Sequence, residues 1–145
     1  MATTYSATDV SFIISHKLLG KKQTAGEGWG SISVAMDDDH TNIAVGADGA
    51  SMISKINSNK GTITLEVQQT SPLNNWLVNA YNKLNKAATN RWAEIEIDIK
   101  ELFDNGIKIT ATKGAFKKLA DHKNGTNGDS KTWTFVFATI TEGAA

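Results

Sequence analysis

Residues able to carry out chemistry are few and widely separated in this sequence. The histidines are His16, His40 and His122, and each lies in an expected loop or turn, where a solvated side chain is the usual state. Zinc binding or general-base catalysis would need partners that converge on them, and the spacing supplies none. Because the chain has no cysteine, thiolate nucleophiles, disulfides and cysteine-based metal sites are excluded. We therefore expect no catalytic site, no metal site and no cofactor.

Two short segments look like ligand-binding loops, but neither has the required context. Counted from Asp37, the sixth residue is Asn42 and the twelfth is Asp48, whereas a calcium-binding EF-hand loop needs glycine and glutamate there. The glycines between Gly26 and Gly30 lead into an expected strand, whereas a dinucleotide-binding loop opens a helix. An acidic turn and a surface loop are the better interpretations.

Composition limits the function classes further. The chain has 145 residues with 15 basic and 15 acidic side chains, and Arg91 is its single arginine. Scarce arginine and zero net charge argue against tight nucleic-acid binding, and they permit close self-assembly. The length and the 40% of hydrophobic residues predict one domain, residues 1–145, with a long loop at 16–30. No apolar run approaches the roughly 20 residues that span a bilayer, so we expect no membrane insertion and a cytoplasmic location.

Alternation of apolar and polar residues with a period of two dominates the sequence and predicts a mainly β fold with antiparallel strands. Asp48-Gly49 is a strong hairpin signal, because both central residues of a type I′ turn need positive φ. Glu94, Glu96 and Asp98 alternate with apolar residues, which is typical of the solvent face of a strand and not of a glycosidase cleft. The predicted strands cover residues 10–14, 32–36, 43–47, 51–56, 62–68, 93–100, 107–112 and 133–140.

One helix interrupts the strands. Ser71 is a good N-cap and Pro72 suits the first helical position, and an apolar stripe then continues to Ala88. This helix is expected to cover the sheet from outside. Residues 114–121 are predicted to be irregular or briefly helical, and residues 133–140 to form a strand that is apolar on both faces.

Several segments, in order along the chain, together resemble the phage tail tube protein family, and the likeness covers about residues 5–137. The segments are Gly46–Gly49, Ser54–Lys55, Gly61–Thr64, Gln69–Leu77, Gly114–Asp121 and Thr132–Phe135. The family is similar to the tube proteins of contractile-tailed phages. The resemblance implies a mainly β (α+β) fold with one helix, an antiparallel β-sandwich or barrel-like tail tube fold. It also implies that hairpins of neighbouring subunits join into an inter-subunit β-barrel in a hexameric ring.

For function, the resemblance implies a structural virion protein and not an enzyme. Hexameric rings would stack into the hollow inner tail tube, which conducts double-stranded DNA, or an injected cargo, into the host cell. The DNA would be a transient, non-specific cargo. Sheath, baseplate and tail terminator proteins would be further partners, with assembly in the bacterial host cytoplasm and a final place in the virion tail.

Within this interpretation, two hairpins are expected to line the channel, residues 93–103 with 107–113 and residues 32–36 with 41–47. Isoleucines at 95, 97, 107 and 109 would face the subunit core. The residues expected to face the channel are Glu94, Glu96, Asp98, Lys108, Thr110 and Thr112. A wall of mixed or acidic charge suits DNA that must slide, because lysines would hold its phosphates.

Stacking between rings is expected to use the loop at 16–30, because long loops in compact domains are usually functional or disordered. Trp29 would be its apolar anchor. Lys21 and Lys22 would meet acidic residues of the next ring, for which the candidates are Asp37, Asp38 and Asp39.

Two other function classes stay open. A monomeric β-sandwich module that binds a ligand or carbohydrate would be favoured by an exposed aromatic cleft, although the four tryptophans are scattered over different elements. A small enzyme is disfavoured because no catalytic constellation is present. A phage tail and a phage-derived injection particle are equally compatible with the resemblance.

Overall fold

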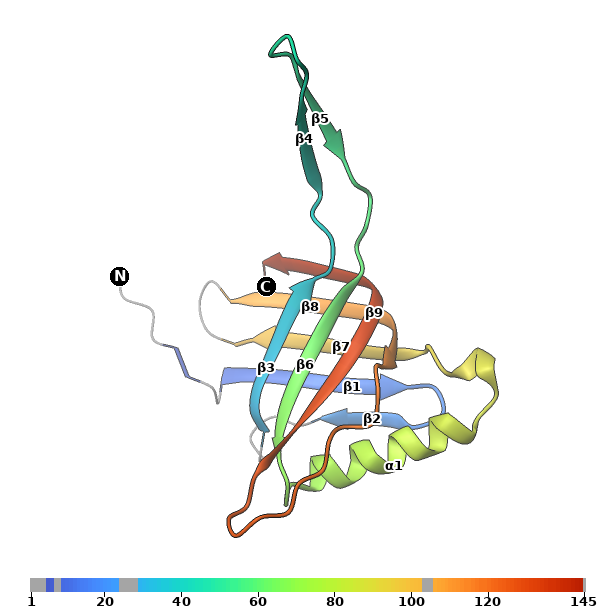
Figure 1. Ribbon diagram of the computed structural model, residues 1–145. Helices are drawn as coiled ribbons and strands as arrows, with labels where there is room; N and C mark the ends of the chain where they lie inside the picture. Colours follow the sequence, from blue (N-terminus) through green and yellow to red (C-terminus); the bar gives the residue numbers. More distant parts are fainter. Residues whose placement is uncertain (1–4, 7–8, 24–28, 103–105, 145) are drawn as a thin grey trace.

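Antiparallel pairing organises the described strands into one curled sheet and one projecting hairpin (Figure 1). The structure is a computed structural model that describes residues 5–6, 9–23, 29–102 and 106–144. The large sheet has the order β2-β1-β7-β8-β9-β6-β3, and β4 and β5 form the projecting hairpin. The strands are β1 (Val10–His16), β2 (Gly20–Gln23), β3 (Trp29–Met36), β4 (Thr41–Val45), β5 (Ser51–Lys55), β6 (Gly61–Gln68), β7 (Ile95–Glu101), β8 (Ile107–Phe116) and β9 (Ser130–Ala144). This confirms the mainly β fold with antiparallel strands.

The long strand β9 connects the two halves of the curled sheet. Its first part pairs with β6, from Ser130 opposite Gln68 to Phe137 opposite Gly61. Its second part pairs with β8, from Phe135 opposite Phe116 to Ala144 opposite Ile107. The sheet therefore folds over itself along β9, and the two walls enclose one hydrophobic core (Figure 1).

Side chains alternate strictly across the β3–β6–β9 wall. Val34, Ile63 and Phe135 lie in register and point into the core, where Ile63 and Phe135 are fully buried. Trp133 is also fully buried, and its indole N–H donates to Asn74 Oδ1 at 3.1 Å. Alternation of this kind was expected, but β9 is covered on one face only, because Val136 points outward and is exposed. The prediction that residues 133–140 are covered on both sides is therefore wrong.

Helix α1 (Pro72–Lys86) lies across one side of the curled sheet (Figure 1). Ser71 is its N-cap, with the hydroxyl accepting from the Leu73 N–H at 3.2 Å, and Pro72 is its first residue, as the sequence predicts. Its buried residues are Leu73, Asn74, Leu77, Ala80 and Leu84. Burial of this stripe closes the core, which confirms the expected role of the helix. The helix ends at Lys86, two residues before the predicted end at Ala88, and a 3-10 helix (Thr89–Arg91) follows.

The predicted hairpin between residues 32–36 and 41–47 does not form. Strand β3 pairs with β6, and β4 pairs with β5. The acidic segment after Met36 does not reverse the chain, because a tight hairpin turn needs positive φ and this segment contains no glycine. The reversal occurs at Asp48-Gly49, as predicted, but the turn is not of type I′, because of these two residues only Gly49 has a positive φ, at +86°. Strands β3 to β6 are thus one long hairpin that is interrupted halfway.

Two other local predictions need correction. Residues 117–121 are irregular, which is one of the two predicted alternatives, but residues 114–116 belong to β8, which continues to Phe116, whose ring packs among the core aromatics 4.9 Å from that of Phe135. Gly114 makes this possible, since any Cβ there would overlap the Phe137 ring. The loop expected at 16–30 contains strand β2, which turns back at Gly20 (φ +76°) and pairs with β1. Residues 24–28 of that loop lie outside the described residues.

We predict that the contact between Asn74 and Trp133 fixes the helix to the sheet. Asn74→Ala would leave the buried indole N–H without its acceptor, at a cost of about 1–3 kcal/mol in the free energy of unfolding. Urea denaturation of the purified chain measures this change. Asn75→Ala, on the exposed neighbouring position, is the matched control and should be close to neutral. Equal stability of the two variants would contradict the assignment.

Candidate functional site

The most unusual surface of the molecule is the β4–β5 hairpin, which projects far from the sheet (Figure 1). We call residues 37–60 the arm. Every residue of β4 is exposed, and the aliphatic side chains Ile43, Val45, Met52 and Ile53 are exposed by 61, 68, 64 and 70%. A two-stranded hairpin is at best marginally stable alone, and exposed apolar strands promote association. The arm therefore has the character of a contact surface.

The register divides the arm into two different faces. Ile43 lies opposite Ile53, so that these side chains share one face. Asn42 lies opposite Ser54 on the other face. Val45 lies on the same face as the two isoleucines, whereas Met52, which pairs with Ala44, lies on the other face.

The root of the arm is held by contacts within the chain. The Asp37 N–H donates to the Lys60 carbonyl at 3.1 Å, and the Ile56 N–H donates to the His40 carbonyl at 2.9 Å. Nε2 of His40 is hydrogen-bonded to the carbonyl of Ser58. These bonds continue the ladder of β3 and β6 into the arm.

Two of the three clustered carboxylates also have partners at this root. The Thr62 hydroxyl donates to Asp37 at 2.9 Å, and the Ser58 hydroxyl donates to Asp38 at 2.7 Å. Asp38 is also 3.6 Å from the Lys60 ammonium. The Ser58 hydrogen bond, assisted by the charge of Lys60, lowers the pKa of the Asp38 carboxyl below its usual value. The acidic cluster therefore stabilises the base of the arm.

The two edges of the large sheet differ strongly in length and charge. Strand β2 forms one edge, has 4 residues and carries Lys21 and Lys22. Strand β3 forms the other edge, has 8 residues and contains no charged residue and no proline. Short, lysine-rich edges resist pairing with other chains, whereas long uncharged edges permit it. The β3 edge is therefore open to strand addition.

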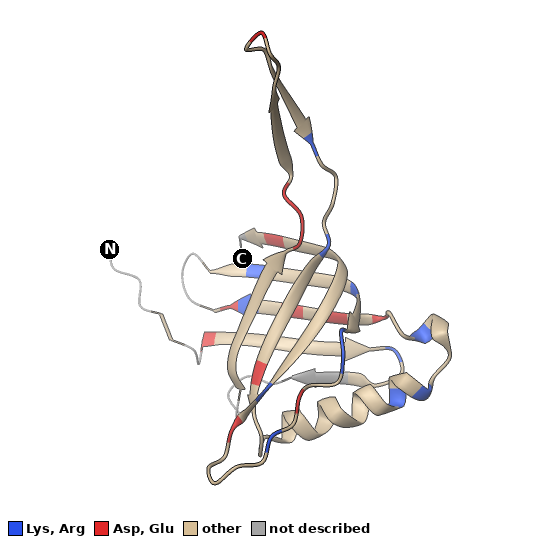
Figure 2. Cartoon of the chain, in the orientation of Figure 1, with Lys and Arg blue, Asp and Glu red and all other residues tan. Residues whose placement is uncertain are grey.

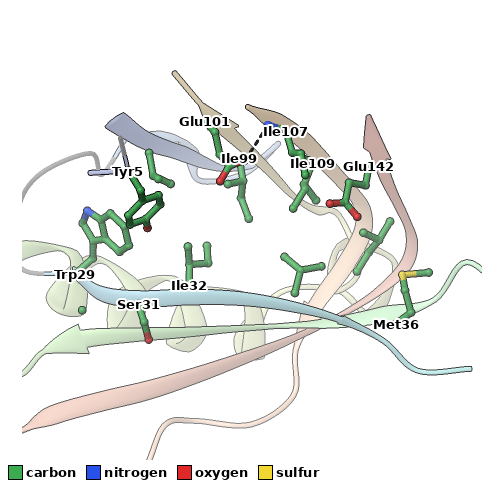
Figure 3. Close-up of a pocket in the computed structure, with 14 residues that line it drawn as sticks. Tyr5, Trp29, Ser31, Ile32, Met36, Ile99, Glu101, Ile107, Ile109 and Glu142 are labelled. Atoms are coloured by element: carbon green, nitrogen blue, oxygen red, sulfur yellow. Dashed lines mark hydrogen bonds between the residues drawn. The ribbon is translucent and has the colours of Figure 1, made fainter. Parts of the chain in front are cut away.

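Between β3 and the ends of β7, β8 and β9 lies a cavity of about 410 Å³ (Figure 3). Its walls are mostly aliphatic, with Ile32 on one side and Ile99 and Ile109 on the other. Glu101 lies on its rim and accepts the Ile107 N–H at 2.8 Å, so this carboxylate caps the β7–β8 connection. Glu142 is a second lining carboxylate. The described lining residues include no histidine or lysine that could work with these acids in catalysis.

The residues predicted to face a channel lie on β7 and β8 or directly before them. The two strands are antiparallel neighbours, which confirms this pairing, although residues 103–105 lie outside the described part of the chain. Ile95 and Ile97 are buried, Ile109 is half-buried, and Ile107 lies at the exposed rim. The exposed members of the predicted set are Glu96, Asp98 and Lys108, and the half-buried ones are Glu94, Thr110 and Thr112. Glu94 pairs with Arg91 at 3.4 Å.

The residues predicted to stack rings are distributed over three places. Lys21 and Lys22 lie in β2, at one edge of the sheet, and Asp37–Asp39 lie at the root of the arm. Trp29 is half-buried in β3 and packs edge-on against Phe12, with ring centroids 5.5 Å apart. It therefore packs against the core of its own subunit, and its role as an anchor between rings stays a prediction. Sequence inspection missed the arm because its strands look like ordinary members of a sheet.

The histidines have structural roles or lie in solvent. His16 is buried, with Nδ1 accepting the Leu18 N–H at 3.0 Å and Nε2 donating to the Arg91 carbonyl at 2.7 Å. His122 lies in an exposed segment. In the part of the chain that is described, no three His, Asp or Glu side chains gather to hold a metal ion, and no helix has the length and apolarity to cross a bilayer.

The sequence matches a known protein family along almost its whole length. The family model described as the bacteriophage PhiTE tail tube protein matches residues 1–143. The chain belongs to this tail tube family. It is therefore a structural component of a phage tail and not an enzyme. No curated protein sequence matches this tail tube protein.

Solved structures share the fold of this tail tube protein. A chain of the anti-feeding prophage baseplate matches with a TM-score of 0.65 at 10% identity, covering 98% of this chain and 97% of that one. A chain of the anti-feeding prophage cap matches with a TM-score of 0.59 at 15% sequence identity, and the match covers 100% of this chain and 95% of that one. A third match is a chain from the sheath–tube complex of an extracellular contractile injection system in the extended state. Its TM-score is 0.55 at 17% sequence identity, and the match covers 92% of this chain and 88% of that one.

We predict that the Asp38 contact in this tail tube protein depends on pH. Because the Asp38 pKa is lowered, the contact is complete above the ordinary aspartate pKa and is lost as the pH falls through the lower, folded value. Ser58→Ala should raise the Asp38 pKa toward its usual value, measured by NMR titration of the carboxyl. Ser54→Ala, elsewhere on the arm, should leave that pKa unchanged. The same Asp38 pKa in wild type and Ser58→Ala would disprove this role of Ser58.

Proposed function

We propose that this chain forms hexameric rings that stack into the hollow inner tube of a contractile-type tail, through which double-stranded DNA or another injected cargo passes. The observation that carries this proposal is the arm, a projecting hairpin whose apolar side chains Ile43, Val45, Met52 and Ile53 are 61–70% exposed. A protein that acts as a monomer would expose this surface permanently. In a stack of rings, the arm is covered by a neighbouring subunit.

The sheet edges support closure of a ring. A ring needs two different, complementary surfaces on each subunit, and β3 supplies one of them, an uncharged edge of 8 residues. A closed barrel removes such edges altogether, which would also protect the tube against uncontrolled aggregation. Zero net charge permits many copies to stack without accumulating repulsion.

The partners of the tube follow from this assembly. Sheath, baseplate and terminator proteins would contact the outside and the ends of the tube, and helix α1 is a candidate surface for the sheath. Assembly would take place in the cytoplasm of the bacterial host, before incorporation into the virion. A carbohydrate-binding module is less well supported, because Trp133 is fully buried and Trp29, Trp76 and Trp92 pack against the core.

The arm predicts how assembly can be abolished without unfolding the subunit. In the double variant Ile43→Asp/Ile53→Asp, two charges replace aliphatic side chains that would each contribute about 1.5–3 kcal/mol when fully buried. We expect this variant to lose tubes in negative-stain electron microscopy and to keep the circular dichroism spectrum of the body. Because the arm residues are exposed, the subunit core is not disturbed.

The matched control is Asn42→Asp/Ser54→Asp, which places the same two charges at paired positions on the opposite face of the arm. We expect it to retain tubes. If the isoleucine variant formed tubes as abundantly as wild type, the arm would not be the assembly contact. Loss of tubes in both variants would support a contact that uses both faces.

A further inference from the structure

The two outward faces of the curled sheet differ sharply in charge (Figure 2). On the β1–β7–β8 wall, Glu96, Asp98, Lys100 and Lys108 point outward. On the β3–β6–β9 wall, Glu66 is the one charged residue among the outward side chains. We call this second surface the hydroxyl face, and it consists of Ser31, Ser33, Ala35, Thr62, Thr64, Glu66, Gln68, Ser130, Thr132, Thr134, Val136 and Ala138.

The residues of the hydroxyl face are aligned by the pairing register of β3, β6 and β9. Ser33, Thr64 and Thr134 lie side by side across the three strands. The basic residue of this part of β9, Lys131, points to the other side, where its ammonium lies 5.5 Å from the centre of the Trp133 ring. A surface of small hydroxyl side chains therefore continues across the whole wall.

We propose that the hydroxyl face is the wall of the channel and fits a moving polyanion, and that the charged β1–β7–β8 face does not line it. This inference rests on the proposed assembly into rings. Double-stranded DNA carries about one negative charge per 1.7 Å, and each lysine that contacts it adds salt-dependent affinity. Repeated around every ring, Lys100 and Lys108 of the charged face would hold the DNA by its phosphates. Hydroxyl groups exchange hydrogen bonds with water and phosphate and add no such attraction between charges.

The sheet edges independently point to the same wall. Strand β3 is the edge that a neighbouring copy of this chain can extend, and it belongs to the hydroxyl face. The opposite edge, β2, is short and carries Lys21 and Lys22. Pairing of β3 with a different strand edge of the next copy would extend the β3–β6–β9 wall across the boundary between subunits. The continuous inner surface of the ring is then the hydroxyl face.

The absence of cysteine from the sequence permits a direct test by single-cysteine labelling. Ser33→Cys places a thiol on the hydroxyl face, and Asp98→Cys places one on the charged face. Each variant is treated, as free subunit and as assembled tube, with a small maleimide and with a maleimide attached to a protein too wide for the channel. We expect Ser33→Cys in tubes to react with the small reagent and to lose its reaction with the bulky one. Asp98→Cys should not show this pattern.

Other labelling results would contradict the assignment of the hydroxyl face to the channel. Reaction of Ser33→Cys with the bulky reagent in tubes, or protection from both reagents, would overturn the assignment of the channel wall. The channel pattern at Asp98→Cys would favour the charged face. Thr64→Cys, in the same row, repeats the test if Ser33→Cys does not assemble. If the unmodified chain itself formed no tubes, the proposed assembly would fail, which is distinct from a misassigned face.

Discussion

Continuous pairing along β9 is the interaction on which the rest of this structure depends. One strand is hydrogen-bonded to β6 over its first part and to β8 over its second part, so both walls of the curled sheet are fixed by it. The inward residues Trp133, Phe135 and Phe137 fill the space that this curl creates. Strand β3 contributes side chains such as Val34 to this core, but its outer backbone edge and the arm take no part in it. They are free to make contacts outside the subunit.

The same arrangement explains why polarity differs between the surfaces. The face that carries charge lies on β7 and β8, whereas the wall next to the open β3 edge is rich in hydroxyl groups. An aliphatic arm, an unprotected edge and a nearly uncharged face all belong to the segment from β3 to β6 and to its neighbour β9. In a tail tube protein, these three features together are those expected of a subunit that assembles with its neighbours as we propose.

Local signals in the sequence predicted local structure well. Ser71 and Pro72 marked the start of the helix, and Asp48-Gly49 marked the hairpin turn, because each depends on the backbone preferences of adjacent residues. The resemblance to tail tube proteins correctly gave the family. The partner of β3 was mispredicted, because the acidic segment after Met36 looks like a turn and the true partner, β6, follows only after the arm.

The surfaces were harder to predict than the elements, since they arise from pairing between distant segments. Ser33, Thr64 and Thr134 form one row only after three strands are aligned. Likewise, nothing local indicates that Ile43 and Ile53 stay outside the core.

Electron cryomicroscopy of tubes assembled from the unmodified chain tests the proposed assembly most directly. We expect these tubes to show stacked rings around an open channel, with each arm covered by another subunit. A uniform monomer at every concentration and salt condition, with its arm uncovered, would contradict it.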